Sequence, residues 1–417
     1  MGSPGTHHLV FFSDCPYYGG AEGYLGMLAE AAPAGWRISA IVPAGKPGEI
    51  LARRFERAGA EVLRFRKASW TSPALWSEVR GHLARLGGDR LHLNLPSVYD
   101  ACLSVPAVLA KRAGYRRVVS TEHLPMVARA RRRVPIKLAM TTAIDAIIVN
   151  TAWNRDRLAH YHHVPLRKIV IIPNGSAESP ALAPEARRAL RAGLGAADDD
   201  VVLAIVARLT ERKGHRFLFA ALQAIAREEP ERRWRLWVVG DGEEREQLGA
   251  QAEALGLAGR ISFLGHRDDV REVIHACDLM VLPSLLETQP FVLTEAMASA
   301  RPIVTTAIYG IPEIVADGVT GCLVPPGEVP PLTRAVARLM AEPETRRRMG
   351  EAGRRRYEER FTVEMVAART YGVIAGASGN GRAASGPSGK EPDWRQPSAD
   401  GRDASRATAG GSTEAHG

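Results

Sequence analysis

The sequence predicts an α/β protein built from two doubly wound domains. Short apolar segments alternate with helical patterns through most of the chain, and such alternation is typical of parallel sheets with helices on both faces. The chain has 417 residues, a length that favours two domains of roughly 100–200 residues each. Its content of 45% apolar and 24% charged residues is ordinary for a globular protein.

The first half begins with a short apolar strand, His8–Ser13, followed by the glycine turn Gly19-Gly20-Ala21-Glu22 and a helical pattern at Tyr24–Ala31. This arrangement can cradle a phosphate, because the free N–H groups of a helix N-terminus attract anions. The turn lacks the G-x-G-x-x-G pattern of a dinucleotide site, and a flexible turn without a ligand is the alternative. The other predicted elements of this half are strands at Arg37–Val42, Glu61–Arg64, Leu91–Leu93, Arg117–Ser120, Ala146–Val149 and Lys168–Ile172, and helices at Glu49–Ala58 and Cys102–Ala113.

A histidine follows one of these strands. Thr121, Glu122 and His123 come directly after Arg117–Ser120, and open α/β sheets bind ligands at the carboxyl ends of their strands. His123 is therefore a candidate site residue, with a purely structural histidine as the alternative.

Pro173-Asn174-Gly175 ends the first half, and a polar segment at Ser176–Asp200 is interpreted as a hinge with a short helix. Its three acids, Asp198 to Asp200, are interpreted as a charged loop, because metal ligands must converge in space. The second half then repeats the alternation, with strands at Val201–Val206, Arg235–Val239, Ile261–Leu264, Leu279–Leu282 and Ile303–Thr305, and helices at His215–Arg227, Glu243–Leu255 and Val270–Ala276.

Two cations, Arg208 and Lys213, share the loop that follows the strand Val201–Val206. Two positive charges at the carboxyl end of a strand can neutralise a diphosphate. Pairing with acids on the protein surface is the alternative for both side chains.

Two carboxylates follow the strand Leu279–Leu282. Glu287 lies on a loop, and Glu295 lies one turn into a helix that is expected to open near Phe291. A loop carboxylate beside a helix N-terminus suits a ligand that combines hydroxyls with phosphate. A nucleotide sugar is such a ligand.

The formal net charge of +9 is concentrated in one segment. Lys111–Lys137 holds nine Lys or Arg residues and one acid, Glu122, for a net charge of +8. A solvated helix face and a docking patch for anionic lipid or a phosphorylated acceptor are both open. Nucleic acid is not expected as a partner, because the basic residues are not regularly interleaved with aromatic residues for base stacking.

Cysteine usage and apolar runs bear on the compartment. The four cysteines, Cys15, Cys102, Cys277 and Cys322, are scattered and suggest neither a disulfide framework nor a zinc site. No signal peptide and no apolar run of about 18 residues is visible. We expect a cytoplasmic protein, with peripheral contact at the inner face of the membrane as a hypothesis.

The predicted domains are an N-terminal domain at residues 1–178 and a C-terminal domain at residues 179–360. They are followed by a helix at residues 361–375 that returns towards the first domain, and by a tail at residues 376–417. The tail is rich in Gly, Ser, Ala and Pro and contains one aromatic residue, Trp394. Such a composition cannot bury a core, so we expect disorder there.

Taken together, these motifs resemble glycosyltransferase family 4, the retaining glycosyl transferases group 1 of GT-B fold, over about residues 8–375. The resemblance depends on Gly19-Gly20-Ala21-Glu22, Thr121-Glu122-His123, Pro173-Asn174-Gly175, Ala207-Arg208-Leu209 with Lys213-Gly214, Gly240-Asp241-Gly242, Asp278 with Pro283-Ser284, the Glu287 and Glu295 pair, and Gly310-Ile311-Pro312-Glu313. Each motif is weak alone, but their shared order is specific.

The resemblance implies two Rossmann-like domains facing across a cleft, with the sugar nucleotide on the C-terminal domain and the acceptor on the N-terminal one. It implies that Arg208 and Lys213 bind the donor diphosphate. Glu287 would contact the transferred sugar, Glu295 the ribose hydroxyls, and His123 would lie near the reacting carbon. The other donor-binding residues that it implies are Gly19, Gly20, Asn174, Gly240, Gly265, His266, Phe291 and Val292, of which Gly265 and His266 read the base.

The function so implied is transfer of a hexose or N-acetylhexosamine from a nucleoside diphosphate sugar to a hydroxyl acceptor, with retained configuration. UDP-sugars are favoured and GDP-mannose is the alternative donor. Neither a metal nor a cofactor is expected, because the two cations do the work of a divalent ion. A sugar-nucleotide epimerase of the same fold and a non-catalytic nucleotide-sugar-binding protein are the competing functions.

The chain departs from the family pattern at four positions. Thr288 and Gln289 stand where the family usually has Gly and an aromatic residue. Because this loop is expected to lie near the sugar, sugar identity is open. Ala300 and Tyr309 each replace a usual Gly.

Overall fold

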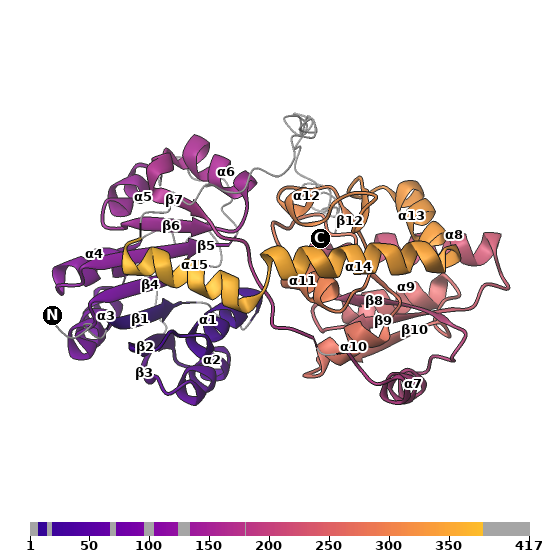
Figure 1. Cartoon of the computed structure of the whole chain (residues 1–417), viewed down its shortest axis with the longest axis horizontal. Coiled ribbons are helices and arrows are strands. Elements are labelled where there is room, and N and C mark those ends of the chain that lie inside the picture. The colour runs from indigo at the N-terminus through magenta and orange to yellow at the C-terminus, as the bar shows by residue number, and fades with distance from the viewer. Residues whose placement is uncertain are drawn as a thin grey trace, which may run out of the picture. The chain divides into compact units, whose positions relative to one another are not determined.

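The computed structural model describes residues 7–14, 19–66, 72–95, 104–123, 134–179 and 181–377. The tail predicted to be disordered lies outside these residues from position 378 onward. The described residues contain two parallel sheets, which Figure 1 shows with their covering helices.

The first sheet has seven strands in the order β3-β2-β1-β4-β5-β6-β7, all parallel. Its strands are β1 (His7–Ser13), β2 (Trp36–Pro43), β3 (Glu61–Phe65), β4 (Arg90–Leu95), β5 (Arg117–Glu122), β6 (Ala146–Val149) and β7 (Ile169–Ile171). The helices of this half are α1 (Gly20–Glu30), α2 (Lys46–Arg57), α3 (Pro73–Leu86), α4 (Val105–Arg112), α5 (Val134–Thr141) and α6 (Ala152–His162), with a short 3₁₀ turn, η2 (Leu166–Lys168).

The second sheet has six parallel strands in the order β10-β9-β8-β11-β12-β13. Its strands are β8 (Val201–Val206), β9 (Trp234–Val239), β10 (Ile261–Gly265), β11 (Leu279–Leu282), β12 (Ile303–Thr306) and β13 (Gly321–Val324). The remaining helices are α7 (Pro184–Gly193), η3 (Glu211–Lys213), α8 (His215–Glu228), α9 (Arg245–Ala254), α10 (Val270–Ala276), α11 (Phe291–Ala298), α12 (Ile311–Ile314), α13 (Val329–Ala341), α14 (Pro343–Arg360) and α15 (Val363–Ala375).

Each sheet reverses its strand order once. In the first sheet the reversal falls between β1 and β4, and in the second it falls between β8 and β11. Ligands of doubly wound sheets bind outside the carboxyl ends of the strands at such a reversal, because the two connecting loops leave in opposite directions there. The strand orders alone therefore predict where each half binds a ligand.

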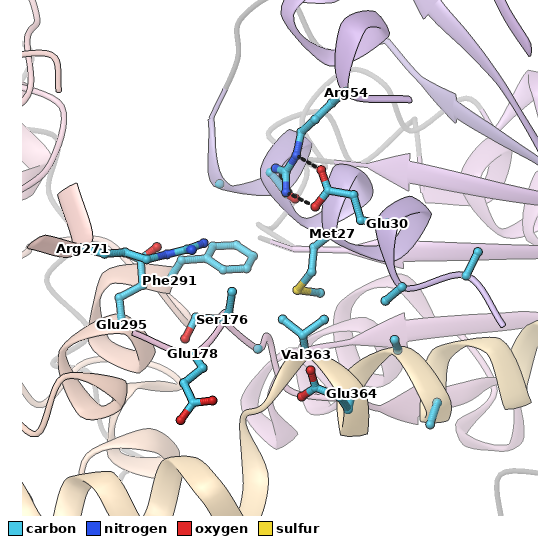
Figure 2. A pocket seen from close by; sticks show the side chains of 18 of the residues that line it. Met27, Glu30, Arg54, Ser176, Glu178, Arg271, Phe291, Glu295, Val363 and Glu364 are labelled. Carbon is cyan, nitrogen blue, oxygen red and sulfur yellow. Dashed lines mark hydrogen bonds and ion pairs between the residues drawn. The ribbon is translucent and has the colours of Figure 1, made fainter. Parts of the chain in front are cut away.

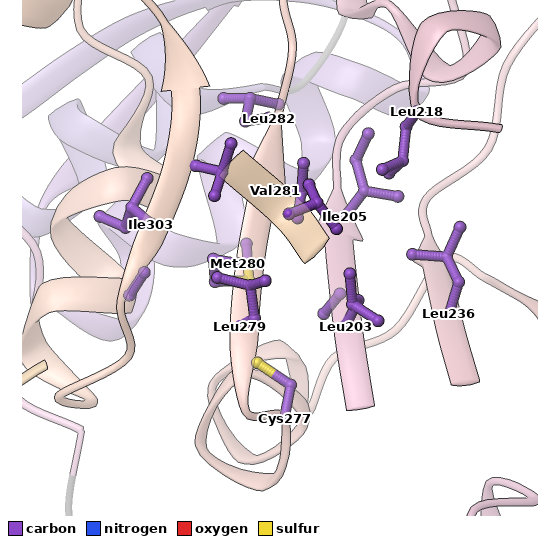
Figure 3. Packing of buried hydrophobic residues seen from close by; sticks show 14 of the residues in the cluster. Leu203, Ile205, Leu218, Leu236, Cys277, Leu279, Met280, Val281, Leu282 and Ile303 are labelled. Carbon is purple, nitrogen blue, oxygen red and sulfur yellow. The ribbon is translucent and has the colours of Figure 1, made fainter. Parts of the chain in front are cut away.

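Apolar residues cover both faces of each sheet. In β1, Leu9 and Phe11 pack into the core beneath α1, α2 and α15, whereas Val10 and Phe12 pack into the core on the opposite face. This alternation follows from the period of two in a strand. Figure 3 shows the central strands of the second sheet, β8 and β11, within one continuous cluster of buried aliphatic side chains.

The last helix belongs to the first sheet although it ends the described chain. Figure 1 shows α14 leading into α15, and α15 packs against α1 and β5. The Tyr371 hydroxyl donates to the Leu28 carbonyl at 2.8 Å, and the Tyr24 hydroxyl bonds Thr370 at 3.2 Å. The helix predicted at residues 361–375 is confirmed, while the domain limits at 178 and 360 stay a prediction.

Most predicted strands are confirmed to within about two residues, and so are the helices at His215–Arg227, Glu243–Leu255 and Val270–Ala276. The sequence analysis did not predict α3, α5, α6, α12, α13, α14 or β13. Two of the four departures from the family pattern keep the backbone of a glycine, with φ of 53° at Ala300 and 45° at Tyr309. A side chain at such an angle strains the backbone, because Cβ crowds the following carbonyl oxygen.

We expect Ala300→Gly to raise the free energy of unfolding by roughly 0.5–1 kcal/mol, since the relief of strain exceeds the extra freedom of glycine in the unfolded chain. Urea denaturation measures the change. Ala296→Gly, inside α11 where the backbone is helical, is the matched control and should lower the free energy of unfolding by about 1 kcal/mol. A lower midpoint for Ala300→Gly would contradict the strain argument.

Candidate active site

The four charged residues predicted to bind the donor flank the strand reversal of the second sheet. Arg208 and Lys213 follow β8, and Glu287 and Glu295 follow β11. The two loops touch, because the Leu285 N–H donates to the Arg212 carbonyl at 2.7 Å.

Close backbone packing brings these loops together. Gly214 has φ of 74°, and a Cβ there would lie 2.1 Å from the Pro283 carbonyl oxygen. Only glycine fits this approach, so the Lys213-Gly214 motif is required by packing between the loops after β8 and β11.

Lys213 and Glu287 form an ion pair, with side chains that are only 13% and 14% exposed. Each charge is largely withdrawn from water and depends on the other, because an unpaired charge at this depth is costly. Arg208 lies in different surroundings: its side chain is 51% exposed and stands 3.6 Å from Glu243. The structure therefore brings Lys213 and Glu287 together in a largely buried ion pair, and it leaves Arg208 half-exposed beside Glu243.

Glu295 lines a cavity of about 920 Å³. Burial raises the pKa of its carboxyl group, while the positive charge of Arg271 acts in the opposite direction. Figure 2 shows Arg271 and Phe291 on one side of this cavity and Met27 of α1 on the other. A volume of this order suits a small organic ligand.

The two halves of the chain meet at one edge of the cavity. Phe291 at the start of α11 packs on Gly20 at the start of α1, where a Cβ would lie 2.7 Å from the Phe291 ring. Of the predicted site residues, only Gly20, Phe291 and Glu295 line this cavity. Further along its wall, Arg54 forms two hydrogen bonds with Glu30, at 2.7 and 2.8 Å.

Gly240, predicted to bind the donor, and Gly265 and His266, predicted to read the base, lie elsewhere. Gly240 has φ of 126° and packs on Ala207, where a Cβ would lie 2.0 Å from the carbonyl oxygen. Its N–H donates to the Gly265 carbonyl at 2.8 Å. The His266 side chain is 85% exposed. Gly240 therefore serves loop packing, and neither Gly265 nor His266 lines the cavity.

In the first half, Gly19 and Gly20 follow β1 and open α1, beside the strand reversal of that sheet. The Gly19 N–H donates to the Glu22 carboxylate at 3.0 Å. Glu22 thus caps the helix from within its first turn, as the Glu of a capping box does.

His123 follows β5, and its imidazole is buried. Its Nε2 lies 2.9 Å from Oδ1 of Asn94, the last residue but one of β4. Burial lowers the pKa of His123 to about 4, so the ring is neutral at ordinary pH. The sequence analysis missed Asn94, although His92 and Asn94 alternate with the leucines of β4 and this pattern was visible in the sequence.

Asn174 is bonded to the loop that carries Glu287. Its N–H donates to Gln289 Oε1 at 2.8 Å, and its side-chain amide donates to the Gln289 carbonyl at 3.0 Å. In return, Gln289 Nε2 donates to the Asn174 carbonyl at 2.9 Å. The Asn174 side chain, which was predicted to contact the donor, therefore forms a hydrogen bond with another part of the protein. Val292, the neighbour of Phe291 in α11, is buried.

A second contact joins α12 to α6. The Glu313 carboxylate accepts hydrogen bonds from the N–H groups of Ala152 at 2.7 Å and Trp153 at 2.9 Å. A carboxylate is favourable at this place because it meets the positive end of a helix. The ring of Tyr309, one of the four departures, contacts that of Trp153 in a tilted arrangement, with ring centroids 4.5 Å apart. The strained backbone at Tyr309 is thus accompanied by an aromatic contact to the first half.

Much of the basic segment Lys111–Lys137 cannot be placed, because residues 124–133 lie outside the described residues. Of the residues that can be placed, Lys111 pairs with Asp145 at 2.7 Å, and Arg117 donates to the Val373 carbonyl at 2.8 Å. These two bases have structural partners, so the described part of the segment offers less free charge than the sequence suggested.

Among the described residues, no cluster of His, Cys, Asp or Glu is arranged to hold a metal ion. In the same part of the chain, no helix is both long and apolar enough to cross a membrane.

The low pKa of His123 makes a prediction about pH. The unfolded histidine binds a proton near pH 6.5, whereas the folded one does so only near pH 4, so the folded state binds fewer protons between these values. The free energy of unfolding should therefore fall as pH drops from 6.5 towards 4. Urea denaturation across this range should give a flatter pH dependence for His123→Gln. A protonated His123 ring in NMR spectra at pH 6 would contradict this prediction.

Comparison with known proteins identifies the family. A family model described as "Glycosyl transferases group 1" matches residues 186–356, and one described as "Glycosyltransferase Family 4" matches residues 18–176. The lipopolysaccharide core biosynthesis glycosyltransferase LpsE of Rhizobium meliloti is 31% identical over 56% of this chain and 64% of its own length, so the match spans under two thirds of that relative.

A GDP-mannose-dependent phosphatidylinositol monomannoside mannosyltransferase of Mycolicibacterium smegmatis is 28% identical over 81% of this chain and 90% of its own length. Among solved structures, Anabaena HepE in complex with UDP-glucose superimposes with a TM-score of 0.74 at 23% identity, covering 88% of this chain and 99% of that one. The strand orders, the sequence motifs and these matches agree. The chain therefore belongs to glycosyltransferase family 4, with the GT-B fold of two Rossmann-like domains.

Proposed function

We propose that this glycosyltransferase moves a hexose or N-acetylhexosamine from a nucleoside diphosphate sugar to a hydroxyl acceptor, with retention of anomeric configuration. The observation that carries the proposal is the largely buried Lys213–Glu287 ion pair at the strand reversal of the second sheet. A cation and a carboxylate meet there at the position where doubly wound sheets bind nucleotides.

The diphosphate of the donor is the natural partner for Lys213. On binding, the phosphate oxygens would take the ammonium group from Glu287, with Arg208 adding a second positive charge from the rim. The exchange keeps Lys213 neutralised, so its burial does not oppose binding. When the sugar leaves, charge develops on the diphosphate, and a fixed cation stabilises it.

The two carboxylates suit the hydroxyl groups of the donor. Glu287, released from Lys213, would accept hydrogen bonds from the transferred sugar, and Glu295 would accept them from the ribose beside the cavity. UDP-sugars are the favoured donors, in keeping with the UDP-glucose bound to the structural relative HepE. GDP-mannose is the alternative, because it appears in the name of one sequence relative.

Retention is proposed through front-face attack, with a donor phosphate oxygen taking the proton of the acceptor hydroxyl. A covalent route would require a carboxylate aimed at the anomeric carbon and a second one about 5 Å away. His123 is buried and neutral. It therefore suits a role as a hydrogen-bonding neighbour of the reacting carbon better than a role as a charged group.

The proposed acceptor is a lipid-linked glycan, a polysaccharide or a small molecule. Two relatives are named for lipopolysaccharide and phosphatidylinositol substrates, which favours the lipid-linked class. Ile136 and Leu138 of α5 are exposed large apolar side chains on either side of Lys137, the last residue of the basic segment Lys111–Lys137. Apolar side chains among basic ones suit peripheral contact with an anionic membrane.

We expect Lys213→Ala to lower turnover by roughly 10²–10³, the loss expected when one preorganised charge stabiliser is removed. The assay is release of labelled sugar or nucleotide from a panel of nucleotide sugars, with and without membrane extract. Arg216→Ala is the matched control, because Arg216 is an exposed cation nearby that pairs with Glu211. Near-normal turnover in Lys213→Ala would overturn the assignment.

We also expect transfer to persist in excess EDTA, because Arg208 and Lys213 are proposed to replace a divalent ion at the diphosphate. The measurement is the initial rate of transfer after dialysis against EDTA, compared with untreated enzyme. Loss of activity that Mg²⁺ or Mn²⁺ restores would show that the cations do not suffice.

A further inference from the structure

Two buried side chains of the loop that carries Glu287 form hydrogen bonds with the first half of the chain. Thr288 Oγ1 donates to the His123 carbonyl at 2.8 Å. Gln289 exchanges three hydrogen bonds with Asn174, at 2.8, 3.0 and 2.9 Å. Four hydrogen bonds therefore join two consecutive residues of this loop to a strand end and a linker from the other half.

These bonds are shielded from water. Thr288 and Gln289 are only 4% and 3% exposed, and Asn174 is 2% exposed. Both polar ends of the Gln289 amide are used, with Oε1 accepting and Nε2 donating. A buried polar group that loses its partner costs about 1–3 kcal/mol, so separation of the two halves at this point is opposed.

Thr288 lies next to two of the proposed site residues, Glu287 and His123. Thr288 directly follows Glu287, which pairs with Lys213 on the donor side. Its hydrogen-bond partner is the backbone of His123, the candidate residue on the acceptor side. One short chain of bonds therefore joins Glu287 to His123 across the two halves.

We propose that Thr288 and Gln289 are positioning residues, which fix the position of Glu287 relative to His123 before the donor binds. This proposal rests on the proposed function, because it concerns the geometry of the same transfer. Thr288 and Gln289 are also the positions at which family 4 usually has Gly and an aromatic residue. Neither of those could form these bonds, because glycine has no hydroxyl and an aromatic ring has no amide.

The consequence is a specific effect on turnover. Catalysis needs reacting groups held close to their productive places, and a misplacement of about 1 Å can cost about 10²-fold in rate. The nucleotide contacts proposed above lie mainly on the second half of the chain. Removal of the hydrogen bonds of Thr288 or Gln289 should therefore lower kcat and leave the affinity for the nucleotide nearly unchanged.

The test uses near-isosteric substitutions in the full-length protein. Thr288→Val removes the hydroxyl and keeps the shape, Gln289→Met removes the amide, and Thr288→Ser restores the hydroxyl. The matched control is Thr305→Val, because Thr305 Oγ1 donates to the Leu282 carbonyl at the same 2.8 Å, is equally buried, and joins two strands of one sheet.

We expect Thr288→Val and Gln289→Met each to lower kcat by about tenfold, with the Kd for UDP changed less than twofold by calorimetry. Thr288→Ser should recover most of the rate, and Thr305→Val should lose stability without losing kcat below its unfolding temperature. A fall in kcat no larger than that of Thr305→Val, or a proportional loss of UDP affinity, would overturn the proposal.

Amide hydrogen exchange of the ligand-free protein supplies a readout that needs no activity. The segments around His123 and Asn174 should exchange faster in Thr288→Val and Gln289→Met and keep their protection in Thr305→Val. If the parent transfers no sugar from any donor, the proposed function fails. Hydrogen exchange then tests by itself whether Thr288 and Gln289 hold the two halves together. Unchanged protection of both segments in the variants would overturn that role.

Discussion

The reversal of strand order between β8 and β11 is the constraint on which the site depends. The loops that follow these neighbouring strands pack against each other at the carboxyl edge of the sheet, so the cation of Lys213 and the carboxylate of Glu287 meet there. Once both are largely buried, each needs the other, because an isolated charge at that depth is costly. We propose that a phosphate linked to a hydroxylated sugar opens the pair, because such a ligand replaces both partners.

The first half contributes groups that are neutral and fixed. His123 is buried, carries a lowered pKa and is bonded to Asn94. It therefore offers a hydrogen-bonding surface of constant charge over the ordinary pH range. In the proposed function, the charges that change partners lie on the second half, so donor binding and support of the acceptor would be divided between the two sheets.

Contacts between the halves use residues at which this chain departs from its family. Thr288 and Gln289 bond the first half directly. Tyr309 keeps a backbone angle typical of glycine and makes a tilted ring contact with Trp153. Ala300 keeps such an angle without an aromatic contact of this kind. At Tyr309 the backbone strain and the aromatic contact coincide, which is how a locally unfavourable residue can persist in a fold.

The sequence by itself determined the described strands except β13, the order of the motifs and the family. Buried parallel strands appear in a sequence as apolar runs, and the motif residues are required by local chemistry. It could not show α14, whose many charged residues hide the helical period and are supported by ion pairs such as Arg347 with Glu351. Only the tertiary structure decided that Lys213 faces Glu287, that Asn174 bonds Gln289, and that Glu295 rather than Gly265 lines the cavity. Each of these depends on which distant segments meet, and a pattern of neighbours along the chain does not contain that information.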